Sequence, residues 1–183
     1  KMIGEFDPSH QVVDHLLVVG PIGAGTSVVA AQAAEISGLP LINLDKIMLD
    51  ESQIPKPKDR FVADAEELFS SPDFQDGWVA DGTFRSLRHL TWNHADLILY
   101  LRPPLVLNSI MVAKRALTND VSGGNSKSSL HTQMRRLYQT RAEDLAKIDQ
   151  TVSEYVARGV RVETLRSPLR VGKILSHIFE AQE

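Results

Sequence analysis

The chain has 183 residues, of which 43% are hydrophobic and 23% are charged, with no cysteine and a formal net charge of −3 at pH 7. This composition is that of a globular protein, so it excludes a collagen repeat, low-complexity disorder and a disulfide scaffold. The lack of cysteine also excludes thiolate metal ligands, and the slightly acidic balance argues against broad nucleic-acid binding.

One domain is expected, because a domain takes roughly 150 residues. We place it at residues 16–183, after an N-terminal tail of residues 1–15, and we expect residues 1–6, which do not begin with Met, to lie outside the natural domain. No apolar run, Leu16–Val19 included, is long enough for a membrane span. A cysteine-free chain fits a reducing compartment, so we expect a cytoplasmic protein with no membrane partner.

Short apolar segments alternate with helical patterns along the chain. Strands are predicted at residues 16–20, 41–44, 78–80, 96–101 and 160–165. Helices are predicted at residues 26–37, 59–69, 87–91, 104–117, 130–158 (with a break) and 168–179. Gly38 is expected to end the first helix and Asp59 to cap the second. The alternation predicts an α/β fold in three layers, a five-stranded parallel sheet with helices on both faces.

Ligands of such sheets bind outside the carboxyl ends of the strands. The residues that directly follow the predicted strands are therefore the first candidates for a site. They are residues 20–27, Asp45, Asp81 and Arg102.

The turn after the first strand is rich in glycine. It consists of Gly20, Pro21, Ile22, Gly23, Ala24, Gly25, Thr26 and Ser27. Gly, four residues, Gly, Lys and Ser or Thr is the spacing of the phosphate-binding P-loop, and only the Lys is missing here. Backbone N–H groups of such a loop bind phosphates, and the Ser27 hydroxyl is placed to ligate Mg²⁺. We predict binding of ATP or another nucleoside triphosphate with Mg²⁺; a glycine turn without a ligand is the alternative.

Thr26 stands where the P-loop Lys would be and offers a neutral hydroxyl instead of a positive charge. Removing one preorganised stabiliser typically costs on the order of 10²–10³ in rate. Either another cation substitutes, or the site binds more than it catalyses. Candidates for the substitute are Lys46, Arg115 and the pair Arg135/Arg136.

Four later segments follow the glycine-rich turn in a fixed order. They are LPLINLD at residues 39–45, WVADGTF at 78–84, ADLILYL at 95–101 and VRVETLRSP at 160–168. With the turn, they make the chain resemble the adenylate kinase-like P-loop kinases, and among these the topology modulation proteins, over about residues 16–179. The resemblance implies a P-loop NTPase fold, a bound nucleotide, and a helical, flexible lid over about residues 118–141.

The resemblance also implies roles for side chains on the acceptor side. Asp81 would ligate a Mg²⁺-bound water or organise the site, and Asp45 would orient an acceptor hydroxyl. Arg85, or else Arg88, would hold the acceptor. The alternatives are a turn at Asp81-Gly82, a helix N-cap at Asp45, and ordinary exposed charge at the two arginines.

On the donor side, the resemblance implies two basic positions one turn apart near the end of the helix at 104–117. Arg115 keeps the phosphate-contacting position, whereas Met111 departs from the base-contacting one, so no preference for adenine is predicted. Arg135 and Arg136 would reach the phosphates from the lid. Adjacent residues on one helix cannot face the same way, so at most one of these two arginines contacts the phosphates directly.

Together these observations predict a small kinase that uses a nucleoside triphosphate, Mg²⁺ and a small-molecule acceptor. The predicted catalytic residues are Asp45, Asp81, Arg115, Arg135 and Arg136. The first alternative is a nucleotide- or phosphate-binding regulatory protein with weak or lost catalysis, because Thr26 replaces the Lys. The second is a P-loop fold used for partner contacts without a nucleotide. Acceptor identity and oligomeric state stay open.

Overall fold

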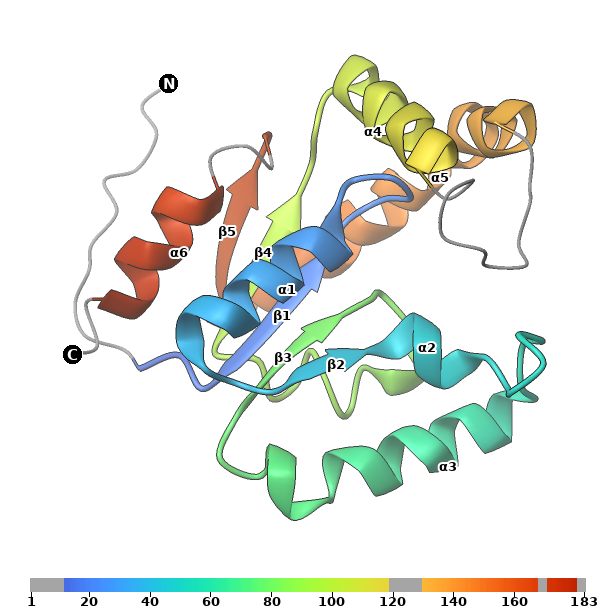
Figure 1. Ribbon diagram of the computed structural model, residues 1–183. Coiled ribbons are helices and arrows are strands. Elements are labelled where there is room, and N and C mark those ends of the chain that lie inside the picture. Colours follow the sequence, from blue (N-terminus) through green and yellow to red (C-terminus); the bar gives the residue numbers. More distant parts are fainter. Residues whose placement is uncertain (1–11, 119–129, 168–170, 181–183) are drawn as a thin grey trace.

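A computed structural model describes residues 12–118, 130–167 and 171–180 of the protein (Figure 1). Its strands are β1 (His15–Val19), β2 (Leu41–Asn43), β3 (Trp78–Asp81), β4 (Leu97–Leu101) and β5 (Arg161–Leu165). They form one sheet in the order β2-β3-β1-β4-β5, and every neighbouring pair is parallel. The prediction of a five-stranded parallel α/β sheet is confirmed.

The α-helices are α1 (Thr26–Ser37), α2 (Leu44–Met48), α3 (Lys58–Phe69), α4 (Leu105–Thr118), α5 (Leu130–Ala157) and α6 (Val171–Glu180). Two short 3₁₀ turns are η1 (Pro72–Phe74) and η2 (Arg85–Leu87). None of these helices, within the described ranges, is both long and apolar enough to cross a membrane.

Most of the predicted helices are present, with four differences. Gly38 ends α1 in the left-handed conformation, as expected. Asp59 does not cap α3, because the helix begins one residue earlier, after Pro57, and Asp59 lies in its first turn. The short α2 was not predicted, and α5 runs without the expected break. The helix predicted at 87–91 is not formed, because η2 ends at Leu87 and residues 88–91 are turns. The predicted start of the last helix at Pro168 lies outside the described residues.

Helices cover both faces of the sheet, which gives three layers (Figure 1). Alternate strand residues point to opposite faces. Leu16 and Val18 of β1 pack in the core beneath α1 and α6, whereas Leu17 and Val19 pack in the core beneath α3 and α5. A parallel sheet buried on both faces needs apolar residues at consecutive positions, which is why its strands read as unbroken apolar runs.

The central position of β1 places the glycine-rich turn. β1 lies between β3 and β4, with Val18 opposite Asp81 and Val19 opposite Tyr100. The turn that leaves β1 therefore emerges in the middle of the carboxyl edge of the sheet. The carboxyl ends of β3 and β4 lie on either side of it.

A polar bridge fastens α5 to β4. The buried Tyr100 hydroxyl donates to Asp149 Oδ1 (2.7 Å), and Arg102 Nη2 pairs with Asp149 Oδ2 (2.9 Å). Burial, and then the hydrogen bond to Asp149, raises the pKa of Tyr100 to about 12. Arg102 follows β4 as predicted, but its guanidinium is paired with Asp149, so it braces a helix.

The bridge predicts how stability depends on alkaline pH. Tyr100 ionises at higher pH in the folded than in the unfolded protein, so its stabilisation is complete below the unfolded pKa of about 10 and is lost above it. Near neutral pH, Tyr100→Phe is expected to lower the free energy of unfolding by about 1 kcal/mol, the net value of one hydrogen bond. Urea unfolding should show this difference shrinking between pH 10 and 11. A difference that stays constant over pH 8–11 contradicts the assignment.

Candidate functional site

The turn after β1 exposes backbone N–H groups at the start of α1. Gly23 (φ 76°) and Gly25 (φ 86°) are both left-handed, and Ala24 N–H donates to the Pro21 carbonyl oxygen (3.0 Å). α1 then begins with Val29 N–H donating to the Gly25 carbonyl oxygen (3.1 Å). The N–H groups ahead of Val29 in the first turn have no helix carbonyl to bind, and the helix dipole favours an anion there.

The glycine-rich turn is pressed between β4 and α4. A Cβ atom on Gly20 would lie 2.9 Å from the Leu101 carbonyl oxygen. One on Gly23 would lie 2.4 Å from Val112 Cγ2 on α4. A side chain at either position would force the loop out of place, so its path depends on these glycines.

Asn108 of α4 holds the tip of the loop. Its Nδ2 donates to the Ile22 carbonyl oxygen (2.9 Å), and its side chain is 0% exposed. Its Oδ1 has no hydrogen-bond partner among the described residues. The sequence analysis did not single out Asn108. The sequence does hold one indication of its role. Asn108 lies one helical turn before Val112, so it is a polar residue on the face of α4 that packs against the core.

Asp81, at the carboxyl end of β3, is the buried acid of this edge. It is 2% exposed, and its Oδ2 lacks a partner in the described part of the chain. A buried carboxylate oxygen without a hydrogen bond is costly unless a cation or an ordered water meets it. Ser27, the other predicted metal ligand, is exposed in the first turn of α1. This donor set of one carboxylate and one hydroxyl fits Mg²⁺, which prefers oxygen ligands and keeps several waters.

Within the described ranges, no group of three or more His, Asp and Glu side chains could hold a metal. A Mg²⁺ ion here would therefore rely on phosphate oxygens and water for its other ligands.

Asp45 and Lys46 follow the edge strand β2, in α2. The alternative that Asp45 caps this helix is wrong, because Asn43 is the N-cap and accepts the Lys46 N–H on its side chain (3.1 Å). Asp45 and Lys46 are both exposed. In sheet order β2 is separated from β1 by β3, so Asp45 and Lys46 lie on the far side of Asp81 from the glycine-rich turn.

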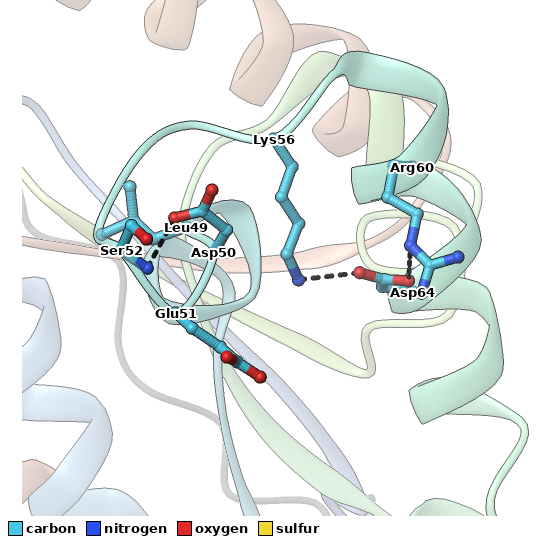
Figure 2. A pocket seen from close by; sticks show the side chains of 7 residues that line it. All are labelled: Leu49, Asp50, Glu51, Ser52, Lys56, Arg60 and Asp64. Atoms are coloured by element: carbon cyan, nitrogen blue, oxygen red, sulfur yellow. Dashed lines mark hydrogen bonds and ion pairs between the residues drawn. The ribbon is translucent and has the colours of Figure 1, made fainter.

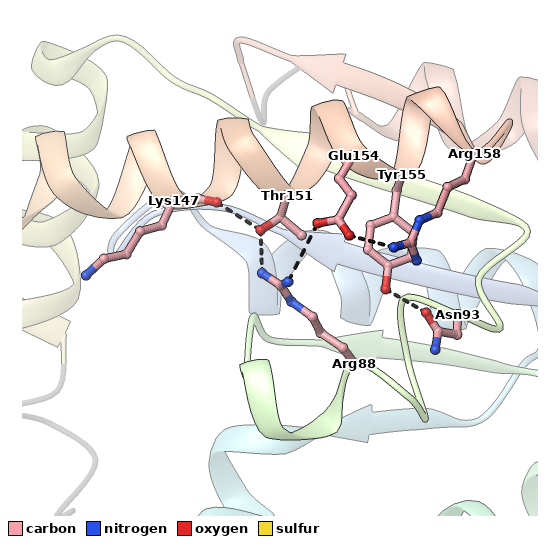
Figure 3. Close-up of polar contacts among 7 residues, drawn as sticks. All are labelled: Arg88, Asn93, Lys147, Thr151, Glu154, Tyr155 and Arg158. Carbon is pink, nitrogen blue, oxygen red and sulfur yellow. Dashed lines mark hydrogen bonds and ion pairs between the residues drawn. The ribbon is translucent and has the colours of Figure 1, made fainter.

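The two arginines predicted to hold an acceptor differ in their surroundings. Arg88 reaches α5, where its guanidinium donates to Thr151 Oγ1 and lies 4.0 Å from Glu154 Oε2 (Figure 3). Arg85 is exposed at the start of η2, close after Asp81. Arg85 therefore suits an acceptor contact better than Arg88, which helps to hold η2 against α5.

Most of the donor-side predictions fall beyond what the structure describes. Residues 119–129 of the predicted lid, and the side chains of Met111, Arg115 and Arg136, lie outside the described part. Arg135 is exposed in the first half of α5.

A polar pocket lies between α3 and the loop that follows α2 (Figure 2). Its volume is about 490 Å³, and it is lined by Leu49, Asp50, Glu51, Ser52, Lys56, Arg60 and Asp64. Asp64 pairs with Lys56 Nζ (2.7 Å) and Arg60 Nε (2.9 Å). The hydrogen bond from Lys56, and then the charge of Arg60, hold the pKa of Asp64 below its usual value. The sequence analysis predicted no site at these residues.

The backbone that forms the pocket is fixed by its own turn. Asp50 Oδ1 accepts hydrogen bonds from Ser52 N–H (2.8 Å) and Ile54 N–H (2.9 Å). Lys56 N–H donates to the Met48 carbonyl oxygen (2.8 Å). These bonds fix the backbone of Asp50 and Glu51, which form an acidic wall of the pocket. Lys56 and Arg60 line the same pocket and supply its positive charge.

No known family model and no curated protein sequence matches the chain. Solved structures do match it. An unliganded sugar kinase from Janibacter sp. HTCC2649 aligns with a TM-score of 0.53 at 14% identity, over 93% of this chain and 96% of that one. A gluconokinase from Sinorhizobium meliloti 1021 aligns with a TM-score of 0.48 at 19% identity, over 92% and 90%. The chain therefore shares the α/β fold of the solved sugar kinase.

Because α4 restricts the loop, we expect Gly→Ala substitutions at two left-handed glycines to lower the free energy of unfolding by different amounts. Gly38→Ala meets no atom within 4 Å, so it should cost only the left-handed backbone strain, about 1–2 kcal/mol. Gly23→Ala adds the collision with Val112 and should cost about 2–5 kcal/mol in all. Urea unfolding at pH 7 measures both values. Equal losses in the two variants would show that α4 does not restrict the loop.

Proposed function

We propose that the protein is a phosphotransferase that moves the γ-phosphoryl group of a nucleoside triphosphate to a hydroxyl of a small acceptor. The observation that carries the proposal is the glycine-rich turn at the end of the central strand. It has the P-loop spacing and is clamped by Asn108 and Val112. The neighbouring strand β3 ends at Asp81, whose buried Oδ2 has no hydrogen-bond partner among the described residues. An anion-binding turn next to such a carboxylate oxygen fits a phosphate chain and its metal ion.

On the donor side, the backbone of residues 20–27 binds the phosphates. Ser27 and Asp81 hold the metal ion, directly or through water. When bound, Mg²⁺ neutralises charge that develops on the phosphate oxygens. Arg115, together with either Arg135 or Arg136, stabilises the transferring group from the α4–α5 side.

On the acceptor side, Asp45 orients the attacking hydroxyl and Arg85 binds a charged or polar group of the acceptor. The acceptor oxygen bonds to the γ-phosphorus as the bond from that phosphorus to the bridging oxygen breaks. The nucleoside diphosphate leaves, and the hydroxyl proton passes to solvent or to Asp45. Orientation matters more than basicity for Asp45, because phosphoryl transfer depends mostly on positioning and charge stabilisation.

The polar pocket beside α3 suits a hydrophilic acceptor. Its volume accommodates a small molecule, and its walls present carboxylates, an ammonium and a guanidinium. The fold is shared with a protein described as a sugar kinase, which agrees with a hydroxyl acceptor by analogy of fold alone.

Thr26 favours a second candidate, a regulatory protein that binds nucleotide without transferring phosphate. The variant Thr26→Lys separates the two. Phosphoryl transfer that appears only in the variant would identify the natural protein as a binder. Transfer by the unmodified protein, changed little by the new Lys, would show that another cation already serves the site.

Calorimetric titration with ATP, GTP and CTP, with and without Mg²⁺, tests the proposal. We expect Mg²⁺-dependent binding of micromolar affinity, about −8 kcal/mol, followed by transfer to members of a panel of small alcohols and nucleotides. An absence of binding at millimolar nucleotide would refute both the kinase and the regulatory proposal. The fold would then serve partner contacts or a smaller anion.

The role of Asp81 has its own test. Asp81→Asn should abolish most of the Mg²⁺ dependence of triphosphate binding and raise the Kd about tenfold or more, since it removes one charged ligand of the ion. Asp73→Asn, at an exposed acid in η1, is the matched control and should leave the Kd unchanged. The proposal for Asp81 fails if both variants keep the same response to Mg²⁺.

A further inference from the structure

Arg141 of α5 is a cation for which the described residues supply no carboxylate partner. It is partly buried, and its Nη2 donates to the Pro103 carbonyl oxygen (2.7 Å). The other partly buried arginines, Arg88 and Arg161, have carboxylates within 4.0 Å. In the described ranges of the chain, Arg141 has none. A partly desolvated cation without a counter-charge favours binding of an anion.

The position of Arg141 is equally informative. Pro103 lies two residues beyond the end of β4, so Arg141 sits at the carboxyl edge of the sheet. The carbonyl of Leu101, the last residue of β4, touches the glycine-rich turn at Gly20. Arg141 therefore contacts the connection between β4, which flanks the turn, and α4, which clamps the turn.

Unpaired polar atoms gather along this edge. Among the described residues, three buried side-chain atoms lack a hydrogen-bond partner: Asp81 Oδ2, Asn108 Oδ1 and Arg141 Nε. Asp81 ends β3, Asn108 holds the loop tip, and Arg141 abuts the chain after β4. Buried groups without partners are rare in native proteins, and a ligand with both acceptor oxygens and a cation at this edge would supply the kinds of partner that these atoms lack.

We propose that Arg141 supplies the positive charge that a P-loop Lys would place beside the phosphates and that Thr26 cannot. This inference rests on the proposed nucleotide site. The guanidinium stays charged at any working pH and offers several N–H donors in a plane, so one can bind Pro103 while others bind a phosphate oxygen.

Other described cations near the carboxyl edge are less suited to this role. Arg102 is neutralised by Asp149, and Arg88 is held by Thr151 and Glu154. Lys46 is exposed beyond the edge strand β2. Of the cations whose side chains the structure describes, Arg141 alone combines partial burial, the lack of a described carboxylate partner and a place against the β4–α4 connection.

The test is a rescue experiment on the full chain, with Mg²⁺-ATP affinity measured by calorimetry. Arg141→Gln should raise the Kd about tenfold to a hundredfold, the equivalent of one hydrogen bond to a charged group. Thr26→Lys in that background should restore the affinity to within a few fold, although it changes the unmodified protein little. A brace that only held Pro103 could not be replaced by a Lys on α1.

Two further variants complete the design. Lys147→Gln removes a charge from the same helix at an exposed pair with Glu143, and should leave the Kd unchanged. Arg141→Lys keeps the charge while losing the planar fork, and should bind within a few fold of the natural protein, which covers the case in which Arg141→Gln does not fold. Weak binding by Arg141→Gln without rescue by Thr26→Lys, or unchanged binding by Arg141→Gln, would overturn this inference alone. Absence of binding by the unmodified protein would overturn it together with the proposed function.

Discussion

The close contact between the glycine-rich turn and α4 organises the functional edge of this protein. The contact admits no side chain at Gly23, and it is fastened by the hydrogen bond from Asn108 to the Ile22 carbonyl. A loop held in this way keeps its N–H groups aimed in one direction, so little ordering is needed when an anion binds. α4 can act as this clamp because its partner α5 is itself fixed to β4 through Asp149, Tyr100 and Arg102.

The electrostatics of the edge follow from which charges are already neutralised. Arg102 and Arg88 serve as links between elements, and each has a carboxylate near it. With Thr26 in place of a Lys, the loop would attract an anion mainly through its backbone and the dipole of α1, a field worth up to about 2 kcal/mol in partly buried geometry. One unbalanced guanidinium nearby would add an attraction of similar or greater size.

Sequence reasoning predicted the strands, their parallel direction and the glycine-rich turn, because apolar runs and glycine spacing are local signals. It did not predict the order of the strands in the sheet. It failed where a side chain's role depends on a distant partner. Arg102 follows a strand, as a site residue would, yet its guanidinium binds Asp149, which lies 47 positions later in the chain. Asn108 carries no motif, and only the packing of α4 brings it to the loop. Arg141 lies at the end of the predicted lid, and only the fold shows that it contacts the β4–α4 connection at Pro103. Asn43, and not Asp45, is the N-cap of α2. Both residues are of a type that caps helices, so the sequence alone did not distinguish between them.

The arrangement of the strands separates two tasks. The elements that would hold a phosphate donor come from β1, β4, α4 and α5, whereas the candidate acceptor residues and the polar pocket come from β2, β3, α2 and α3. Asp81 lies where the two groups meet, since β3 is the strand between β1 and β2. Changes in the α2–α3 loop can therefore alter the acceptor without disturbing the clamp on the turn. Thr26, in contrast, lies in the donor half, so the proposed cation from α5 would act on that half alone.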